Sequence, residues 1–390
     1  MSIIDGAYSP LKIFHHGSRI AELRDGRQPA PVHVQLVVSD LCNQDCRFCA
    51  YRMSGYTSNE LFAGIDPHSG RATRNPRRLI PLEKCLEVLD DCVELGVRAV
   101  QITGGGEPTV HPRHDEIFRA VVDRGLELAL VTNGMALRPA IDEILLRARW
   151  VRVSLDAGNA ASYATIRRTS LSAYHRTLAN IRRLVERRVE GQESRARKEP
   201  TPRLSGSGLS TLDSRLSIGV GFVVTRDNWR EVVDAARTVQ ELGVDSFRIS
   251  AVFQPEGRRY FDGWHEEART LCQEAESLAT GHFRVFNLFG QRLDDLRQER
   301  PDYAFCGYQH FTTYIGADLN VYRCCNTAYS ARGRIGSIRD GRFRDLWRSA
   351  AKEADFAAFD ARDCLRCQFN GKNRMIHYAV DRAPEDVGFV

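Results

Sequence analysis

Short apolar runs alternate with amphipathic helical patterns over most of this 390-residue chain, beginning at Val32. Strands that alternate with helices form a parallel sheet covered by helices. Six such units predict an α/β fold with a partial (β/α)6 barrel of the TIM type, and the side chains that follow its strands should gather at one rim. The expected strands are 32–39, 99–103, 127–132, 150–155, 216–224 and 246–250, and the expected helices are 81–95, 112–124, 139–147, 171–188 and 228–242.

Composition narrows the class of protein. The 55 basic residues exceed the 50 acidic ones by only five, which suits anionic small molecules, and we do not expect a nucleic-acid partner. The first 20 residues have no secretory pattern, and no run of 18 apolar residues predicts a membrane span. We therefore expect a cytoplasmic protein, with no membrane partner, whose 11 cysteines are reduced and available to bind metal.

Three cysteines follow the first expected strand, at Cys42, Cys46 and Cys49. Three thiolates on one loop hold three corners of a 4Fe-4S cluster and leave the fourth iron without a protein ligand. Structural zinc takes four protein ligands, one more than this loop supplies. The spacing therefore predicts an iron site that is open for chemistry.

A second group lies near the C-terminus, at Cys306, Cys324, Cys364 and Cys367. Four thiolates complete a 4Fe-4S cluster with no open iron or form a tetrahedral zinc site, and the spacing does not choose between them. Residues 314–324 predict a hairpin inside this group, followed by an extended segment at 335–338 and a helix at 343–349.

Glycines and polar side chains follow the later strands. A glycine run lets a ligand reach the backbone, and a carboxylate after it binds an ammonium group. Polar residues at strand ends are also ordinary turn residues, so these positions are weaker candidates. The candidates are Gly104, Gly105, Gly106 and Glu107 after the second strand, Asn133 after the third, Ser154 and Asp156 around the end of the fourth, and Ser250 at the end of the sixth.

The spacing C-x3-C-x2-C, with Phe48 just before the last cysteine, resembles the signature of the radical S-adenosylmethionine (radical SAM) superfamily. The resemblance implies that the open iron chelates S-adenosylmethionine and that an electron from the cluster splits it into methionine and a 5′-deoxyadenosyl radical. It also implies that the stretch from Gly104 to Glu107 holds the amino group of this cofactor. The carboxylate and the ribose of S-adenosylmethionine are expected to bind at the ends of the third and fourth strands. The implied cofactor-binding residues are Phe48, Gly104, Gly105, Gly106, Glu107, Asn133, Ser154, Asp156 and Ser250.

The second cysteine group resembles the twitch module, a shortened SPASM domain that carries one auxiliary 4Fe-4S cluster. Two clusters are thus implied, the first with three cysteine ligands and the auxiliary one with four. Cys325 is not needed as a ligand in this scheme. It is an alternative ligand, a hydrogen-atom donor in catalysis or a cysteine without a role in the site. The implied organisation is a lead-in at 1–30, a radical SAM partial barrel at 31–290, a twitch/SPASM domain at 300–370 and a tail at 371–390.

Two long connections interrupt the barrel. Residues 53–80 start at the active-site rim, and their aromatic residues favour a lid that shields a radical from water, with disorder as the alternative. Residues 190–215 are polar and join a helix to a strand at the opposite face. We expect them to form a flexible surface tether without a catalytic role.

The reaction is less constrained than its first step. Four-cysteine auxiliary clusters accept an electron from a substrate radical, so we expect a two-electron oxidation, a dehydrogenation, of a small polar metabolite, with an external reductant of the flavodoxin or ferredoxin type. Only 41 residues precede Cys42, too few for a leader-binding domain of the kind found in peptide-modifying relatives, although leaderless peptides stay open. The alternatives are a radical epimerase, a peptide-modifying or RNA-modifying radical SAM enzyme, and a non-catalytic metal-binding module.

Overall fold

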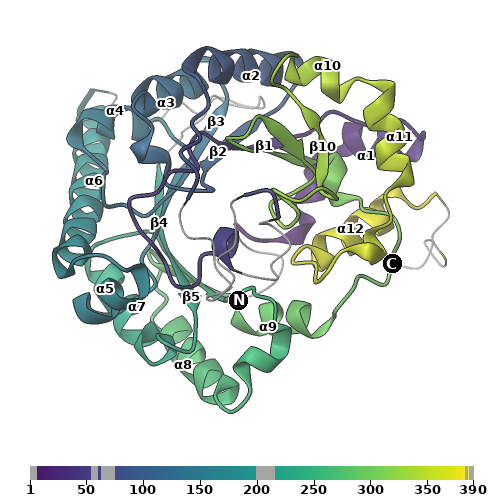
Figure 1. Cartoon of the computed structure of the whole chain (residues 1–390). Helices are drawn as coiled ribbons and strands as arrows, with labels where there is room; N and C mark the ends of the chain where they lie inside the picture. Colours follow the sequence, from purple (N-terminus) through teal and green to yellow (C-terminus); the bar gives the residue numbers. More distant parts are fainter. Residues whose placement is uncertain (1–6, 54–59, 63–74, 199–215, 383–384, 386–390) are drawn as a thin grey trace.

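The computed structural model of the chain describes residues 7–53, 60–62, 75–198, 216–382 and 385. The described strands form one ten-stranded sheet in the order β10-β9-β8-β1-β2-β3-β4-β5-β6-β7. Strands β1 to β7 curve into a partial barrel with helices around its outside (Figure 1). The sheet stays open because β7 and β10 stand at its two ends. The predicted α/β fold with a partial TIM-type barrel is confirmed.

The barrel strands are parallel to their neighbours, and two of them, β2 and β4, alternate in burial along their whole length. In β4, Val151 and Val153 are fully buried under the helices, whereas Arg152 and Ser154 are half-buried and face the barrel interior. The six predicted strands are confirmed, and β7 adds a strand too short to give a sequence signal. The strands are β1 His33–Val37, β2 Ala99–Thr103, β3 Glu127–Thr132, β4 Trp150–Ser154, β5 Ser217–Val224, β6 Ser246–Ala251 and β7 Arg284–Asn287.

Amphipathic helices cover the outer face of these strands. In the first of them, α2, Cys85, Val88, Leu89 and Cys92 are buried at the spacing of one helix face, so these two cysteines, which belong to neither cysteine group, are core residues. The helices are α2 Leu82–Glu94, α3 His114–Asp123, α4 Asp142–Leu145, α5 Ala160–Arg167, α6 Leu171–Lys198, α7 Val232–Glu241, α8 His265–Ser277 and α9 Phe289–Arg297. Short 3-10 turns are η2 Ala50–Arg52, η3 Pro108–Val110, η4 Pro139–Ile141, η5 Trp229–Glu231 and η6 Gly257–Phe261.

The C-terminal part joins the same sheet. Strand β8 pairs with β1 in parallel, with His33 opposite Thr312, and β9 pairs with β8 in the antiparallel sense. The hairpin predicted at 314–324 is thereby confirmed. The elements are η7 Tyr308–His310, β8 Thr312–Ile315, β9 Asn320–Tyr322, β10 Arg334–Ser337, α10 Phe343–Trp347, α11 Ala350–Ala358, η8 Ala361–Asp363 and α12 Asn370–Val380.

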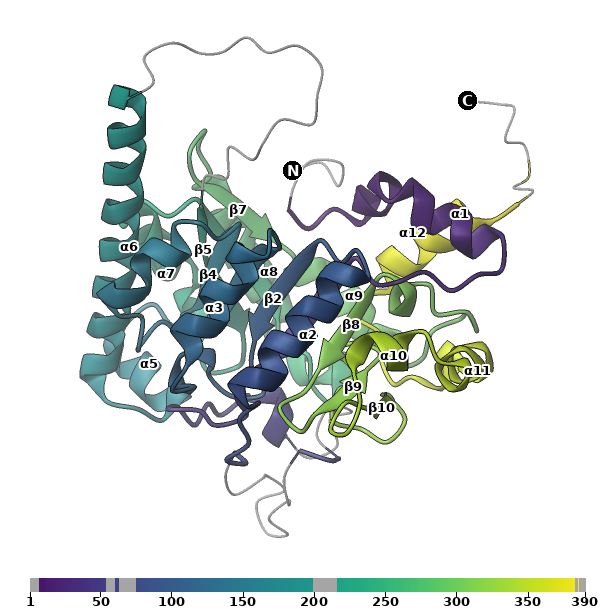
Figure 2. The same ribbon diagram turned by 90° about the horizontal axis from the view of Figure 1, so that it is seen from above.

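The two ends of the described chain pack together. The N-terminal η1 Pro10–His15 and α1 Gly17–Arg24 lie beside α12, as Figure 2 shows. Ile13, Ile20 and Ile376 form a small apolar cluster there, separate from the main core. The first part of the expected tail is thus a docked helix, and residues 383–384 and 386–390 lie outside the described residues.

The prediction for residues 190–215 was partly wrong, because α6 continues to Lys198. The residues at 190–198 include Glu, Gln, Ala, Arg and Lys, which favour helix even without an apolar face. Residues 199–215, and residues 54–59 and 63–74 of the expected lid, lie outside the described residues. None of the helices in the described ranges has the length and apolar character needed to cross a bilayer.

Candidate active site

Cys42, Cys46 and Cys49 lie on the loop that leaves the C-terminal end of β1, here called the cluster loop (residues 38–52). The N–H of Cys49 donates to the carbonyl of Cys46 over 3.2 Å, so these two cysteines share a tight turn. Burial, then the charges of Glu107, Cys46 and Cys49, raise the pKa of the Cys42 thiol to about 12. The three thiols therefore lie close enough to act on one another electrostatically.

These residues fit a cluster with three cysteine ligands. Among the residues that the structure describes, no group of three or more His, Cys, Asp or Glu side chains is closed into a metal site. Two arginines nevertheless lie at the thiols: Nη1 of Arg167 is 3.5 Å from Sγ of Cys46, and Arg52 hydrogen-bonds the thiol of Cys49. Cations beside cysteine favour the thiolate, which is the form that binds iron.

Arg167 is a site residue that the sequence analysis missed. It is the last residue of α5 and is buried. Its Nη2 donates to the carbonyl of Ser154 over 2.8 Å and binds the carboxylate of Asp156, while Nη1 donates to Oε1 of Gln44 over 3.1 Å. One guanidinium thus ties the cluster loop to the end of β4. No sequence motif marks it, because arginine is abundant throughout the chain.

Glu107 is buried beside the cluster loop, at the end of the glycine segment. Its Oε1 accepts from the hydroxyls of Thr109 and Thr132, each over 2.6 Å, and its Oε2 accepts from the N–H of Asn133 over 2.7 Å. A carboxylate oxygen accepts more than one hydrogen bond, so Oε2 keeps capacity for an ammonium donor. The assignment of Glu107 to the cofactor amino group stays a prediction.

The three glycines are required by the protein's own packing. A Cβ on Gly106 would lie 2.1 Å from the carbonyl oxygen of Leu41, and one on Gly105 would lie 2.2 Å from a carboxylate oxygen of Asp40. A Cβ on Gly104 would meet the carbonyl of Gly106 at 1.7 Å. The segment therefore presses against the residues just before Cys42, which brings the glycine stretch and the cysteine trio together as the resemblance implied.

The other predicted cofactor residues lie around the same rim, and their roles remain predictions. Asn133 joins the cluster loop through a 2.7 Å bond from its Nδ2 to Oδ1 of Asn43. The Arg167 guanidinium lies over the ring of Phe48, with its Cζ 5.8 Å from the ring centroid. Asp156 is occupied by Arg167 and the N–H of Val223, so it positions other residues in this structure. Ser154 ends β4, and Ser250 is buried near the end of β6.

A pocket of about 620 Å³ opens beside the cluster loop. Asn43, His111, Met135 and Asn180 contribute to its wall. None of the predicted cofactor residues lines it. We therefore assign it no role in cofactor binding.

The second cysteine group converges on one cavity. Cys306, Cys324, Cys364 and Cys367 all line it, together with Tyr303 and other side chains. The N–H of Phe369 donates to Sγ of Cys367 over 3.3 Å, a contact that stabilises a charged sulfur. Four thiols around one cavity fit either an auxiliary 4Fe-4S cluster or a zinc ion, so the choice between the two stays open at this point.

Cys325 lies at the edge of this group and does not line the cavity. Its sulfur accepts from Nε2 of Gln368 over 3.5 Å, and burial raises the pKa of its thiol to about 12. The charges of Arg292 on α9 and Lys372 on α12 act on it. Its catalytic role stays a prediction.

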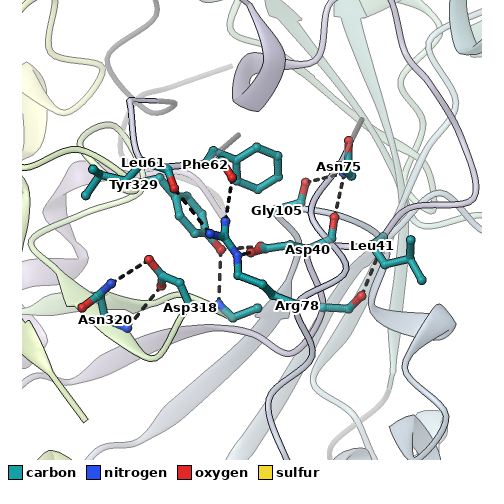
Figure 3. A network of polar contacts seen from close by, with 12 residues as sticks. Asp40, Leu41, Leu61, Phe62, Asn75, Arg78, Gly105, Asp318, Asn320 and Tyr329 are labelled. Atoms are coloured by element: carbon teal, nitrogen blue, oxygen red, sulfur yellow. Dashed lines mark hydrogen bonds and ion pairs between the residues drawn. The ribbon is translucent and has the colours of Figure 1, made fainter. Parts of the chain in front are cut away.

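A polar network joins the cluster loop to the C-terminal part (Figure 3). The buried carboxylate of Asp40 accepts from Nε of Arg78 over 2.7 Å and from the hydroxyl of Tyr329 over 2.5 Å. Nδ2 of Asn75 donates to the carbonyls of Asp40, over 2.7 Å, and of Gly105, over 3.3 Å. The glycine segment, the cluster loop and the turn between β9 and β10, which lies between Cys324 and Cys364 in the chain, are therefore held in one arrangement.

Comparisons with known proteins agree with this arrangement. Residues 36–192 match the model of the radical SAM superfamily. This chain therefore contains a radical SAM domain. The region that matches contains the cysteine trio, the glycine segment and Arg167, which are the residues that the structure brings together.

Two curated relatives extend the comparison of this radical SAM protein. The tungsten-containing aldehyde ferredoxin oxidoreductase cofactor-modifying protein of Pyrococcus furiosus is 31% identical over 171 residues, 42% of this chain and 41% of that protein. The chain thus spans less than half the length of that relative. The mycofactocin maturase MftC of Mycolicibacterium smegmatis is 24% identical over 339 residues, 84% of this chain and 73% of that protein.

The fold of this radical SAM protein is also that of solved enzymes. SuiB of Streptococcus suis, bound to its precursor peptide SuiA, superposes with a TM-score of 0.58 at 13% identity, covering 91% of this chain and 73% of SuiB. The same protein bound to S-adenosylmethionine gives 0.57 at 12% identity, covering 92% and 74%. At this identity the likeness shows the fold, which includes the C-terminal part.

Proposed function

We propose that this chain cleaves S-adenosylmethionine reductively and uses the product radical to oxidise a substrate carbon by two electrons. The observation that carries the proposal is the pairing of two unlike cysteine sets on one sheet. Three thiols lie after the end of β1, and four more line one cavity in the C-terminal part, whose strand β8 lies beside β1.

When bound, the cluster at the trio and S-adenosylmethionine supply a 5′-deoxyadenosyl radical, and the four-cysteine cluster supplies an acceptor for one electron. The substrate then loses a hydrogen atom, an electron and a proton in all, which is a dehydrogenation. Around these groups Arg167 offsets the negative charge at Cys46, and Glu107 holds a cofactor ammonium. The external donor that starts each cycle is a one-electron reductant of the flavodoxin or ferredoxin type.

A small polar metabolite is the first candidate substrate. The half-buried interior face of β4 carries Arg152 and Ser154, which suit a polar molecule rather than an apolar one. Peptide modification is the second candidate. It is favoured because the name of MftC identifies a maturase and its match covers 84% of this chain, and because SuiB was solved with a precursor peptide.

Anaerobic reconstitution tests the proposal. The wild-type chain should bind about eight irons and eight sulfides and should form 5′-deoxyadenosine from S-adenosylmethionine with dithionite. Cys46→Ala should abolish 5′-deoxyadenosine, and Cys364→Ala should lower the iron content to about four while ending substrate oxidation. Cys272→Ala, a buried cysteine on α8, is the matched control and should keep the wild-type iron content.

A zinc-loaded, colourless protein would overturn the proposal, as would 5′-deoxyadenosine formation that survives Cys46→Ala. Anaerobic turnover with pools of small metabolites and with candidate peptides separates the two substrate classes. The class that yields a product two mass units lighter, in step with 5′-deoxyadenosine, is the substrate class.

A further inference from the structure

Two arginines face the interior of the partial barrel without an acidic partner, and a lysine of the C-terminal part, also without one, interacts electrostatically with one of them. They are Arg152 on β4, Arg248 on β6 and Lys372 on α12. In the described part of the chain, none of the three has a carboxylate within the 4.0 Å of an ion pair. By contrast, the buried arginines Arg167 and Arg188 each form an ion pair with a carboxylate, that of Asp156 and that of Asp245.

Strand β5 brings the two arginines together. Its residues Gly219 and Gly221 lie between them in the sheet, with Arg152 opposite Gly219 and Arg248 opposite Gly221. A Cβ on Gly221 would be 3.6 Å from Cδ of Arg152, so the stem of this arginine lies across the glycine strand toward β6. The arginine heads meet at Tyr8, whose hydroxyl accepts from Nη1 of Arg152 over 3.2 Å, and whose ring centroid is 5.2 Å from Cζ of Arg248.

The charges of this group repel one another. Burial, then the charge of Arg152, lower the pKa of Arg248 to about 9. Burial, with the charges of Lys12, Arg292 and Arg248, lowers the pKa of Lys372 to about 8. The buried Nε of Arg248 has no hydrogen-bond partner among the described residues. Asp156 acts on Arg248 less strongly than Arg152, Tyr8 and Arg292 do, and it already binds Arg167.

We propose that Arg152, Arg248 and Lys372 bind an anionic group of the substrate, a carboxylate or a phosphate, inside the partial barrel. The inference rests on the proposed function, because it assigns the barrel interior to the substrate. Guanidinium groups bind both anions through paired hydrogen bonds, and an anion between the three cations removes their repulsion. A neutral sugar or an uncharged peptide segment leaves these charges unmatched.

The position of this group suits a substrate. Arg152 and Arg248 precede Ser154 and Ser250 by two residues, so each pair shares the interior face of its strand. Two residues of a strand span about 7 Å, which places the cations one layer below the rim that carries the cysteine trio. Cys325 acts electrostatically on Lys372 from the auxiliary side. A substrate whose anionic end lies on the cations therefore extends its carbon atoms toward the rim.

Titration calorimetry of the reconstituted, S-adenosylmethionine-bound enzyme at low salt tests the assignment, with inorganic phosphate and glutarate as probes. We expect one or both to bind, Arg152→Gln and Arg248→Gln each to weaken binding at least tenfold, and Arg248→Lys to weaken it less. Binding of phosphate alone identifies a phosphorylated substrate, and binding of glutarate alone identifies a carboxylate. Arg237→Gln, which removes an exposed arginine on α7 that pairs with Glu274, is the control.

The inference is overturned if the wild-type enzyme holds its iron and forms 5′-deoxyadenosine but binds neither probe, or if both glutamine variants bind as tightly as the wild type. Failure of the proposed function looks different: the wild type would then form no 5′-deoxyadenosine whatever it binds. Iron content of each variant reports its folding, and Arg248→Lys serves where a glutamine variant does not load iron.

Discussion

Nη1 of Arg167 lies 3.5 Å from Sγ of Cys46, although the two residues are 121 positions apart in the chain. The same guanidinium binds Asp156, and both partners of this ion pair are buried. Arg167 therefore combines two tasks: it stabilises the end of β4 and it places a positive charge beside the first cluster.

Arg167→Gln tests both tasks. Removing one partner of a buried ion pair costs about 3–5 kcal/mol of stability, because the remaining charge stays buried and unpaired. Loss of the positive charge should also make the first cluster harder to reduce, so its midpoint potential should fall. Arg187→Gln, an exposed arginine on α6, is the control for both measurements. An unchanged potential in a folded, iron-loaded Arg167→Gln protein would contradict the charge role.

Gly106→Ala should displace the cluster loop. Its Cβ would lie 2.1 Å from the carbonyl oxygen of Leu41, and backbone atoms cannot move aside as a flexible side chain does. The variant should lose about four of about eight irons, with the auxiliary signal retained in electron paramagnetic resonance. Gly281→Ala has no atom within 4 Å of the added Cβ and should bind iron as the wild type does. Full iron content in Gly106→Ala would show that the loop accommodates a methyl group.

Tyr329→Phe tests the network between the cluster loop and the C-terminal part. The buried carboxylate of Asp40 loses a donor, and the N–H of Ala317 loses its acceptor, the Tyr329 hydroxyl 3.2 Å away. Unsatisfied buried groups of this kind cost about 1–3 kcal/mol each. Heat or urea unfolding should show the loss, whereas Tyr378→Phe, at a 61% exposed tyrosine, should leave stability unchanged. Equal stability of the two variants would show that the hydrogen bonds of Tyr329 do not stabilise the fold.

Buried His310 should make stability depend on pH. Burial, then the charges of Lys352 and Arg323, lower the pKa of its imidazole to about 3, against about 6.5 in an unfolded chain. Between these values the unfolded chain binds more protons than the folded one, so stability falls as pH falls through this window. Between pH 7.5 and 5.5 the thermal midpoint of the wild type should therefore decrease more than that of His310→Phe. An exposed-histidine variant, His282→Asn, controls for the loss of one imidazole; equal slopes for wild type and His310→Phe would contradict the prediction.

Much of this architecture is readable in the sequence because it rests on local patterns. The two-residue alternation of β4 and the one-sided burial of α2 each arise within a short window, and the cysteine trio lies within eight residues. The contact between Arg167 and Cys46 has no local signal, since it joins distant segments and uses the most common basic residue of the chain. Strand β7 was missed because it has four residues, and the end of α6 because it is polar on all sides.

The parallel pairing of β1 with β8 has a consequence for any attempt to divide this protein. A truncation after β7 would remove one neighbour of β1 and leave an unpaired edge whose Val34, Leu36 and Val37 are buried in the whole chain, and such an edge can pair with other chains. The C-terminal segment thus covers the edge of the barrel sheet at β1 and prevents it from pairing with other chains. Exchanging it between homologues should succeed only when the recipient strand keeps its register.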